Sequence, residues 1–171
     1  MENPRERGVL DWVLEVVAVG ATIWGVLPIR FYSQIGADAR IPTHYNIDGV
    51  ADGWGDKSML MILPIMILAI YVGLTVMERF YKKFNYPTMQ ITMSNAIYSN
   101  RIYRLGVRMV RAIKPIIIVM LAYLYNAVTI NALDGGTEIN PIVMSGLLIL
   151  LLVVVCIYMI MMIRAKYRIK E

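Results

Sequence analysis

Hydrophobic residues along the chain gather into four long runs that are separated by polar segments. The runs cover residues 12–32, 58–77, 115–133 and 139–163. A helix needs roughly 20 residues to cross the hydrocarbon core of a bilayer, and each run is close to that length. The last three runs contain no charged residue. The pattern therefore predicts four transmembrane helices, with longer polar connections at 33–57 and 78–114.

The apolar runs are expected to be helical, because backbone groups in hydrocarbon must find hydrogen-bond partners within their own segment. None of the runs has the alternating pattern of a transmembrane β-strand. Of the 171 residues, 58% are hydrophobic and 17% are charged, whereas soluble domains usually carry about 25% charged residues. We expect an all-α integral membrane protein that forms a single membrane domain over residues 1–171.

Lysine and arginine residues are distributed unevenly over the segments between the runs. Three of the 17, Arg30, Arg40 and Lys57, flank or lie within the connection between the first two runs. The other 14 lie on the opposite side: Arg5, Arg7, Arg79, Lys82, Lys83, Arg101, Arg104, Arg108, Arg111, Lys114, Arg164, Lys166, Arg168 and Lys170. Because cytoplasmic loops are enriched in basic residues, both termini and the segment 78–114 are predicted to be cytoplasmic, and the loop 33–57 is predicted to lie outside. The net charge of +5 then reflects topology, and no nucleic-acid partner is expected.

Two acidic residues stand at the start of the first run. Asp11 and Glu15 are four residues apart and therefore share a helical face, and Arg7 precedes Asp11 by one further turn. One interpretation places them in water at the cytoplasmic interface, paired with Arg7 or with the basic segment. The other treats them as functional, because ionisable residues in membrane spans usually are.

Small and amide residues inside the runs predict contacts between helices. Ala21 and Gly25 in the first run, and Ala69 and Gly73 in the second, are four residues apart and would allow close helix packing. Asn126, near the middle of the third run, is expected to hydrogen-bond a neighbouring helix.

The segment from Ser94 to Lys114 has the pattern of an amphipathic helix, with Ser94 as its N-cap. Its basic residues recur every three or four positions and form one stripe: Arg101, Arg104, Arg108, Arg111 and Lys114. Such a helix beside a membrane is expected to lie on anionic lipids of the cytoplasmic face, and Pro115 would kink it or separate it from the third span. The alternative is a docking surface for a cytoplasmic regulator.

The loop 33–57 carries most of the candidate chemistry. It contains the single histidine of the chain, His44, and two Asp-Gly pairs that predict turns. Tyr45 and Trp54 are expected to anchor it at the outer headgroups. His44 with Asp48 and Asp52 is a weak candidate for a metal site, because strong zinc sites contain more histidine or cysteine. Ligand binding without a metal and a turn-rich connector are the other interpretations, and no cofactor is expected.

The same loop resembles a known family. The segments Pro42-Thr43-His44-Tyr45-Asn46, Gly49 and Asp52-Gly53-Trp54-Gly55-Asp56-Lys57 resemble the signature of a bacterial membrane domain of unknown function that forms the N-terminal part of SdpI-type proteins. These proteins confer immunity to a sporulation-delaying peptide toxin. The resemblance extends through Phe84-Asn85-Tyr86-Pro87, Ile91-Thr92 and Asn95-Ala96, and covers roughly residues 16 to 125. Where the family has acidic residues after the Ile-Thr pair, this chain has Met93 and Ser94.

The resemblance implies a multi-pass protein of the bacterial cytoplasmic (inner) membrane, and it supplies no catalytic residues. The leading hypothesis is a membrane protein that is not an enzyme. Its outer loop would recognise an extracytoplasmic peptide ligand through loop positions that match the signature: Pro42, His44, Asn46, Gly49, Asp52, Gly53, Trp54 and Lys57. The function expected is peptide-toxin immunity or envelope signalling. The alternative is a small transporter or a metal-dependent intramembrane enzyme that uses the His44 loop.

Overall fold

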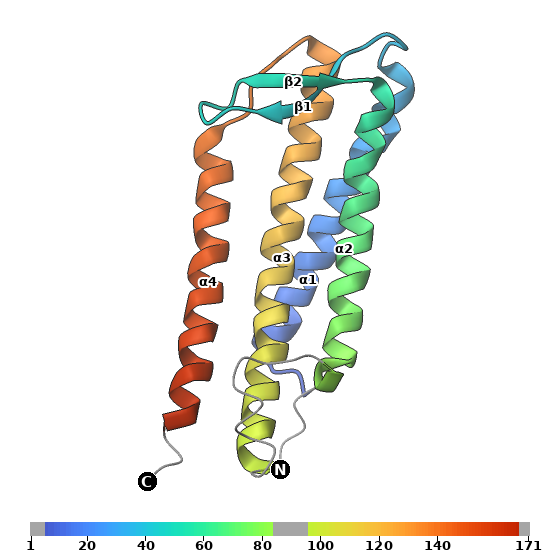
Figure 1. Cartoon of the computed structure of the whole chain (residues 1–171). Helices are drawn as coiled ribbons and strands as arrows, with labels where there is room; N and C mark the ends of the chain where they lie inside the picture. Colours follow the sequence, from blue (N-terminus) through green and yellow to red (C-terminus); the bar gives the residue numbers. More distant parts are fainter. Residues whose placement is uncertain (1–5, 84–95, 168–171) are drawn as a thin grey trace.

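A computed structural model describes residues 6–83 and 96–167 of the chain. Figure 1 shows long helices that run side by side, with a small β-hairpin across one end. The elements occur in the order α1 (Val9–Val26), η1 (Leu27–Gln34), β1 (Ile41–Tyr45), β2 (Ala51–Gly55), η2 (Lys57–Met61), α2 (Ile62–Arg79), η3 (Tyr81–Lys83), α3 (Ala96–Asp134) and α4 (Pro141–Tyr167), where η marks a 3-10 helix. We call the end that carries β1 and β2 the hairpin end, and the opposite end, where α1 and α3 begin and α2 and α4 end, the basic end.

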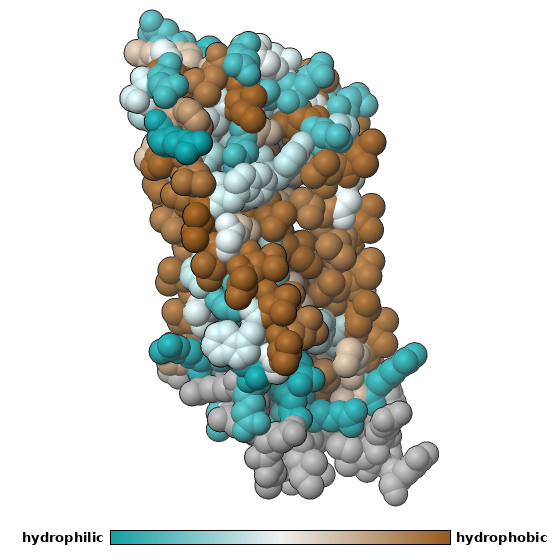
Figure 2. Space-filling view, turned by 180° about the vertical axis from the view of Figure 1, so that it is seen from behind, coloured by the Kyte–Doolittle hydropathy of each residue, from teal (hydrophilic) through white to brown (hydrophobic). Residues whose placement is uncertain are grey.

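Within the described residues, four helical segments are long and apolar enough to cross a membrane. They are Val9–Gln34, Lys57–Arg79, Asn100–Asp134 and Pro141–Ala165. Their outer surface forms an apolar belt between hydrophilic ends in Figure 2. The predicted four spans are confirmed, as in a multi-pass membrane protein, although the helices extend further than the apolar runs do.

Helix α3 is continuous over 39 residues and contains Pro115. Proline has no N–H, so the Arg111 carbonyl loses its usual helical donor, but the chain continues in the same direction. The segment predicted as an amphipathic helix is helical in its described part, from Ala96 onward, but this part is the first half of α3 and not a helix of its own. The expected N-cap Ser94, and the segments 84–87 and 91–95, lie outside the described residues.

The main core lies where α1, α2 and α3 pack together. Its fully buried residues include Ala18, Ile67, Ile118 and Tyr125. Helix α4 lies against α3 and stands to the side of this group in Figure 1. As a result, α4 exposes more of its surface than the other spans do.

The predicted small-residue contacts are correct for the first span and wrong for the second. Gly25 is buried, and a Cβ built on it would lie 2.8 Å from the Cβ of Ala122 on α3. Ala69 and Gly73 are exposed, and a Cβ on Gly73 would meet no atom within 4 Å. The close approach is therefore between α1 and α3.

Candidate functional site

The hairpin is stabilised locally by the side chain of Asn46. Strands β1 and β2 pair antiparallel, and the turn between them begins at Asn46. The Asn46 Oδ1 atom accepts hydrogen bonds from the backbone N–H groups of Asp48 at 3.0 Å and Val50 at 2.9 Å. Asparagine in this role forms an Asx-type turn. The turn predicted from the Asp-Gly pair at 48–49 is thus present.

The loop between α3 and α4 closes over the same turn. The Ile139 N–H donates to the Gly49 carbonyl at 2.8 Å, and the Ala51 N–H donates to the Thr137 carbonyl at 2.8 Å. Gly49 has a φ of +82°, and a Cβ on it would lie 2.3 Å from the Ile139 carbonyl oxygen. Glycine is therefore required at position 49, both for its conformation and for the close approach of the second loop.

A mainly apolar cavity of about 510 Å³ lies beneath the hairpin. It is lined by parts of β1 and the hairpin turn, by η2 and the start of α2, and by residues of α3, α4 and the segment between them. Leu63, Val128 and Met144 represent α2, α3 and α4 in this lining. The volume falls in the range of small-molecule binding sites, which are usually apolar with a few polar groups.

The cavity includes half of the predicted ligand-binding positions. Pro42, His44, Asn46 and Gly49 are among its lining residues. The other four lie outside the described lining: Asp52, Gly53, Trp54 and Lys57. The first group belongs to β1 and the turn, and the second group belongs to β2 and the start of η2. The signature residues of β1 and the turn therefore line the cavity, whereas those of β2 and η2 lie outside its described lining.

The second-strand residues support the hairpin in different ways. A Cβ on Gly53 would lie 2.9 Å from the Cβ of His44, so the absence of a side chain lets the strands approach closely. Lys57 donates from its Nζ to the Ile35 carbonyl at 2.6 Å and lies 4.6 Å from the centre of the Tyr32 ring. Trp54 is partly exposed and pairs with Pro42 in the strand register. These contacts join the two strands to each other and tie the start of η2 to Tyr32 and Ile35.

His44 pairs with Asp52 across the strands, through Nδ1 and Oδ1. Asp48 takes no part in this pair, and its backbone N–H is bound by Asn46. Among the residues that the structure describes, no group of three or more histidine, cysteine or acidic residues is placed to hold a metal ion. The hypothetical metal site of His44, Asp48 and Asp52 is therefore not assembled.

Tyr45 connects the hairpin to α3. The Asn131 side-chain amide donates to the Tyr45 hydroxyl oxygen at 3.4 Å and to the Glu138 carbonyl at 2.8 Å. Burial raises the pKa of the Tyr45 phenol above its ordinary value, so this group stays neutral over the physiological range. The Tyr45 side chain is half-buried and forms part of the cavity wall, so at least part of it contacts protein.

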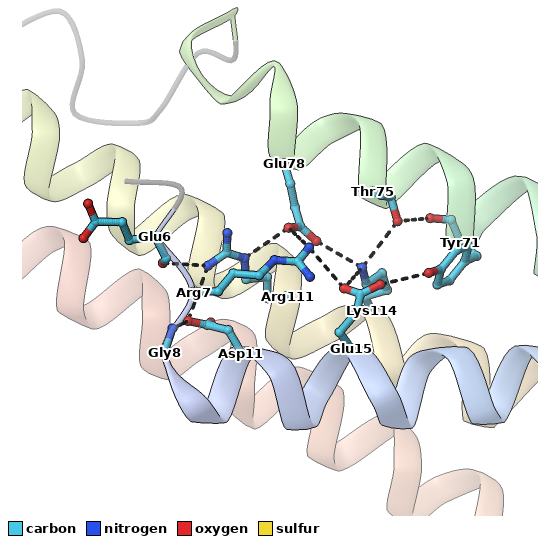
Figure 3. A network of polar contacts seen from close by, with 10 residues as sticks. All are labelled: Glu6, Arg7, Gly8, Asp11, Glu15, Tyr71, Thr75, Glu78, Arg111 and Lys114. Atoms are coloured by element: carbon cyan, nitrogen blue, oxygen red, sulfur yellow. Dashed lines mark hydrogen bonds and ion pairs between the residues drawn. The ribbon is translucent and has the colours of Figure 1, made fainter. Parts of the chain in front are cut away.

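A second polar site lies at the basic end, on the faces of α1, α2 and α3 that meet (Figure 3). Lys114 is 1% exposed, and its Nζ contacts Glu15 Oε2 at 2.7 Å and Glu78 Oε1 at 3.1 Å. It also donates to the Thr75 hydroxyl at 3.3 Å. The Tyr71 hydroxyl donates to the other oxygen of Glu15 at 2.9 Å.

Two arginines complete this site. Arg111 Nε lies 3.1 Å from Glu78 Oε2, and its Nη1 lies 3.4 Å from Asp11 Oδ2. Arg7 Nη2 reaches Glu78 at 3.2 Å and Glu15 at 3.4 Å. We call Arg7, Asp11, Glu15, Glu78, Arg111 and Lys114 the ion-pair cluster; these six residues carry equal numbers of positive and negative charges.

The ion-pair cluster corrects two expectations. Arg111 and Lys114 were predicted to face the membrane surface, but they are 3% and 1% exposed and pair with acids of α1 and α2. One of the two interpretations of Asp11 placed it in water, but it is buried. The expected pairing of the acids with Arg7 is correct for Glu15. Of the remaining stripe, Arg101 and Arg108 are exposed and Arg104 is partly buried.

A sequence signal for the cluster existed but was incomplete. Asp11 and Glu15 share one face of α1, and the three-residue spacing of Arg111 and Lys114 places them on one face of α3. Glu78 showed no such spacing partner, because it comes directly after the apolar run of α2 as a single acid. Its burial depends on the way the helices pack.

Comparison with known proteins gives one domain match. Residues 14–68 match a family model described as a domain of unknown function (DUF1648). The match runs from within α1 through η1 and the hairpin into α2, and so includes the hairpin residues that line the cavity. No curated protein and no solved structure matches the chain.

Proposed function

We propose that this chain binds a membrane-active peptide in the cavity beneath its hairpin and protects the cell that carries it, in the manner of SdpI-type immunity proteins. The cavity of about 510 Å³ is the observation that supports the proposal. Its apolar lining suits hydrophobic side chains of a peptide that partitions into the bilayer. Three polar lining residues, Thr43, His44 and Asn46, belong to the hairpin and suit the peptide backbone.

The construction of the hairpin favours recognition. Asn46 accepts a hydrogen bond from the Val50 N–H across the turn, and the Gly49 carbonyl accepts one from the Ile139 N–H in the next loop. Lys57 ties the start of η2 to Ile35. A loop held in this way loses little conformational entropy when a ligand binds. The match to a domain of unknown function at residues 14–68 covers this loop.

The charge distribution supports the side from which the ligand would approach. Arg30, Arg40 and Lys57 belong to the hairpin end, and the other described basic residues belong to the basic end. Under the positive-inside rule, the hairpin end faces outward and both termini are cytoplasmic. In this proposal the protein lies in the bacterial inner membrane and binds its peptide at the extracytoplasmic face.

The proposal is tested by filling the cavity. Cells that express the chain are compared with cells that lack it for growth in a panel of membrane-active peptides. We expect protection against at least one peptide, and we expect Met144→Trp to abolish this protection by occupying the cavity. Leu148→Trp, one turn further along the exposed surface of α4, is the matched control and keeps the protection. Membrane levels of both variants are measured by immunoblot.

Binding of the protective peptide to the purified protein gives the second measurement. A loss of binding free energy of about 1.4 kcal/mol weakens binding about tenfold, and Met144→Trp should cost at least this amount. Protection by no peptide of the panel, or equal protection by both tryptophan variants, contradicts the proposal.

A further inference from the structure

Helices α3 and α4 form a second, smaller cavity at the basic end, about 180 Å³ in volume. It is lined by Arg101 and Leu105 of α3 and by Met161, Arg164 and Ala165 of α4. Each helix thus contributes one arginine, and the remaining lining is apolar. Arg101 precedes Leu105 by one turn on α3, and Arg164 comes three residues after Met161 on α4. Because the two helices are antiparallel, both arginines lie near the ends of the membrane-spanning segments at the basic end.

The apolar part of this cavity belongs to a small packed core. Ile102, Leu105, Met162 and Ala165 are buried against one another where the two helices meet. Both arginines are exposed. The side chains therefore offer two guanidinium groups beside a firm apolar surface.

The two helices that line this cavity bring no acidic residue to the basic end. The sequence contains no aspartate or glutamate from Arg79 to Leu133, and none from Ile139 to Lys170. The acids of the basic end that belong to spans, Asp11, Glu15 and Glu78, are already paired within the ion-pair cluster. Among the residues that the structure describes, these acids are thus engaged, and the arginines of the α3–α4 cavity are placed to attract an anion.

We propose that the α3–α4 cavity binds the phosphate of an anionic phospholipid, with Arg101 and Arg164 as its ligands. A guanidinium group matches the oxygens of a phosphate with paired hydrogen bonds, which an ammonium group does not do. Basic pockets between membrane-spanning helices bind lipid headgroups in this manner. The exposed apolar side chains of Ile157 and Met161, one turn apart on α4, give the acyl chain a surface to lie on.

This proposal replaces the general surface contact expected from the arginine stripe with a defined site. Arg111 and Lys114 leave the set because they belong to the ion-pair cluster, and Arg164 joins it from a distant part of the sequence. A phosphate from a soluble ion would satisfy the same arginines, so the test separates the two sources.

The test uses the purified full chain in detergent, titrated with phosphatidylglycerol or phosphatidylcholine and observed by native mass spectrometry. We expect one bound phosphatidylglycerol at low lipid concentration and much weaker retention of phosphatidylcholine. One charge near a membrane surface corresponds to about a fivefold change in affinity, so Arg101→Gln and Arg164→Gln should each weaken binding about fivefold and the double variant about twentyfold. Excess inorganic phosphate should displace little lipid, because the ion has no acyl chain.

The matched control removes the same number of charges from the hairpin end. Arg30→Gln combined with Arg40→Gln leaves the retained phosphatidylglycerol unchanged if the α3–α4 cavity is the site. Thermal unfolding of each variant checks that the fold is intact. Equal loss in the control, equal binding of both lipids, or full displacement by inorganic phosphate overturns the proposal.

Discussion

Glycine is required at position 49 for two separate reasons. Its φ of +82° lies in the left-handed region, and the space where a Cβ would stand is occupied by the Ile139 carbonyl oxygen. Gly49→Ala should lower the free energy of unfolding by about 2 kcal/mol or more, because the left-handed conformation alone costs an alanine about 1–2 kcal/mol. Thermal unfolding in detergent measures the change.

Gly36→Ala is the control for this substitution. Position 36 has no atom within 4 Å of a built Cβ and no positive φ. It should change the unfolding temperature little. If the two variants unfold at the same temperature, Gly49 does not hold the hairpin in the way described.

Lys114 joins α3 to both α1 and α2 within the ion-pair cluster. It contacts Glu15 and Glu78 from α3 while 1% exposed. Lys114→Met should cost roughly 3 kcal/mol of stability, because removal of one partner leaves buried carboxylates without their counter-charge. Lys114→Met combined with Glu15→Gln restores the balance of charge and should recover part of this loss.

Lys82→Met removes a lysine that is exposed on η3 and serves as the control for the Lys114 series. It should leave stability near the wild-type value. Chemical denaturation in mixed micelles compares the four proteins, and a double variant no more stable than Lys114→Met would show that charge balance is not what the cluster provides.

At the scale of elements, the contact between α1 and α3 depends on the absence of a side chain at position 25. Gly25→Val should force the helices apart, because even a Cβ built on Gly25 would lie 2.8 Å from the Ala122 Cβ and 3.0 Å from the Ile67 Cδ1. Gly73→Val on the exposed face of α2 is the matched control. Each variant is extracted from membranes into detergent, and the amount of folded protein is compared by size-exclusion chromatography. We expect a loss for Gly25→Val, and similar losses for both variants would refute this contact.

Helix α3 also shows why the periodicity of the sequence assigned too many basic residues to the membrane surface. The arginine spacing over 101–114 was correct as a helical face, and this segment is helical. The same spacing fits a face that meets acids on neighbouring helices and a face that meets lipid headgroups. The first alternative holds for Arg111 and Lys114, which lie where α1 and α2 supply Asp11, Glu15 and Glu78.

At the scale of the molecule, orientation in the membrane is the property that the charge asymmetry predicts. Single cysteines at Asp48 and Asp134, in a Cys156→Ala background, should react with an impermeant thiol reagent added to intact cells. Both native residues are exposed at the hairpin end. Cysteines at Lys82 and Arg164, exposed at the basic end, should react only after the cells are opened. The reverse pattern would place the hairpin in the cytoplasm.

The sequence by itself determined the class of the protein and the presence of its spans. Uncharged runs of about 20 residues have one stable solution in hydrocarbon, because each backbone group must be satisfied within its own helix. Local chemistry was equally informative at the hairpin, where the Asp48-Gly49 pair predicted the turn that is present. These features depend on residues close together in the chain.

The tertiary structure decided which residues share a site. The cavity beneath the hairpin joins β1 to α2, α3 and α4, and the ion-pair cluster joins Arg7 to Glu78 and Arg111. Such groupings depend on which helix faces meet, and in a membrane both buried and lipid-facing positions are apolar, so hydrophobic periodicity does not separate them. For this reason Ala69 and Gly73 were predicted to pack against another helix although they are exposed, and two buried cations were assigned to the surface.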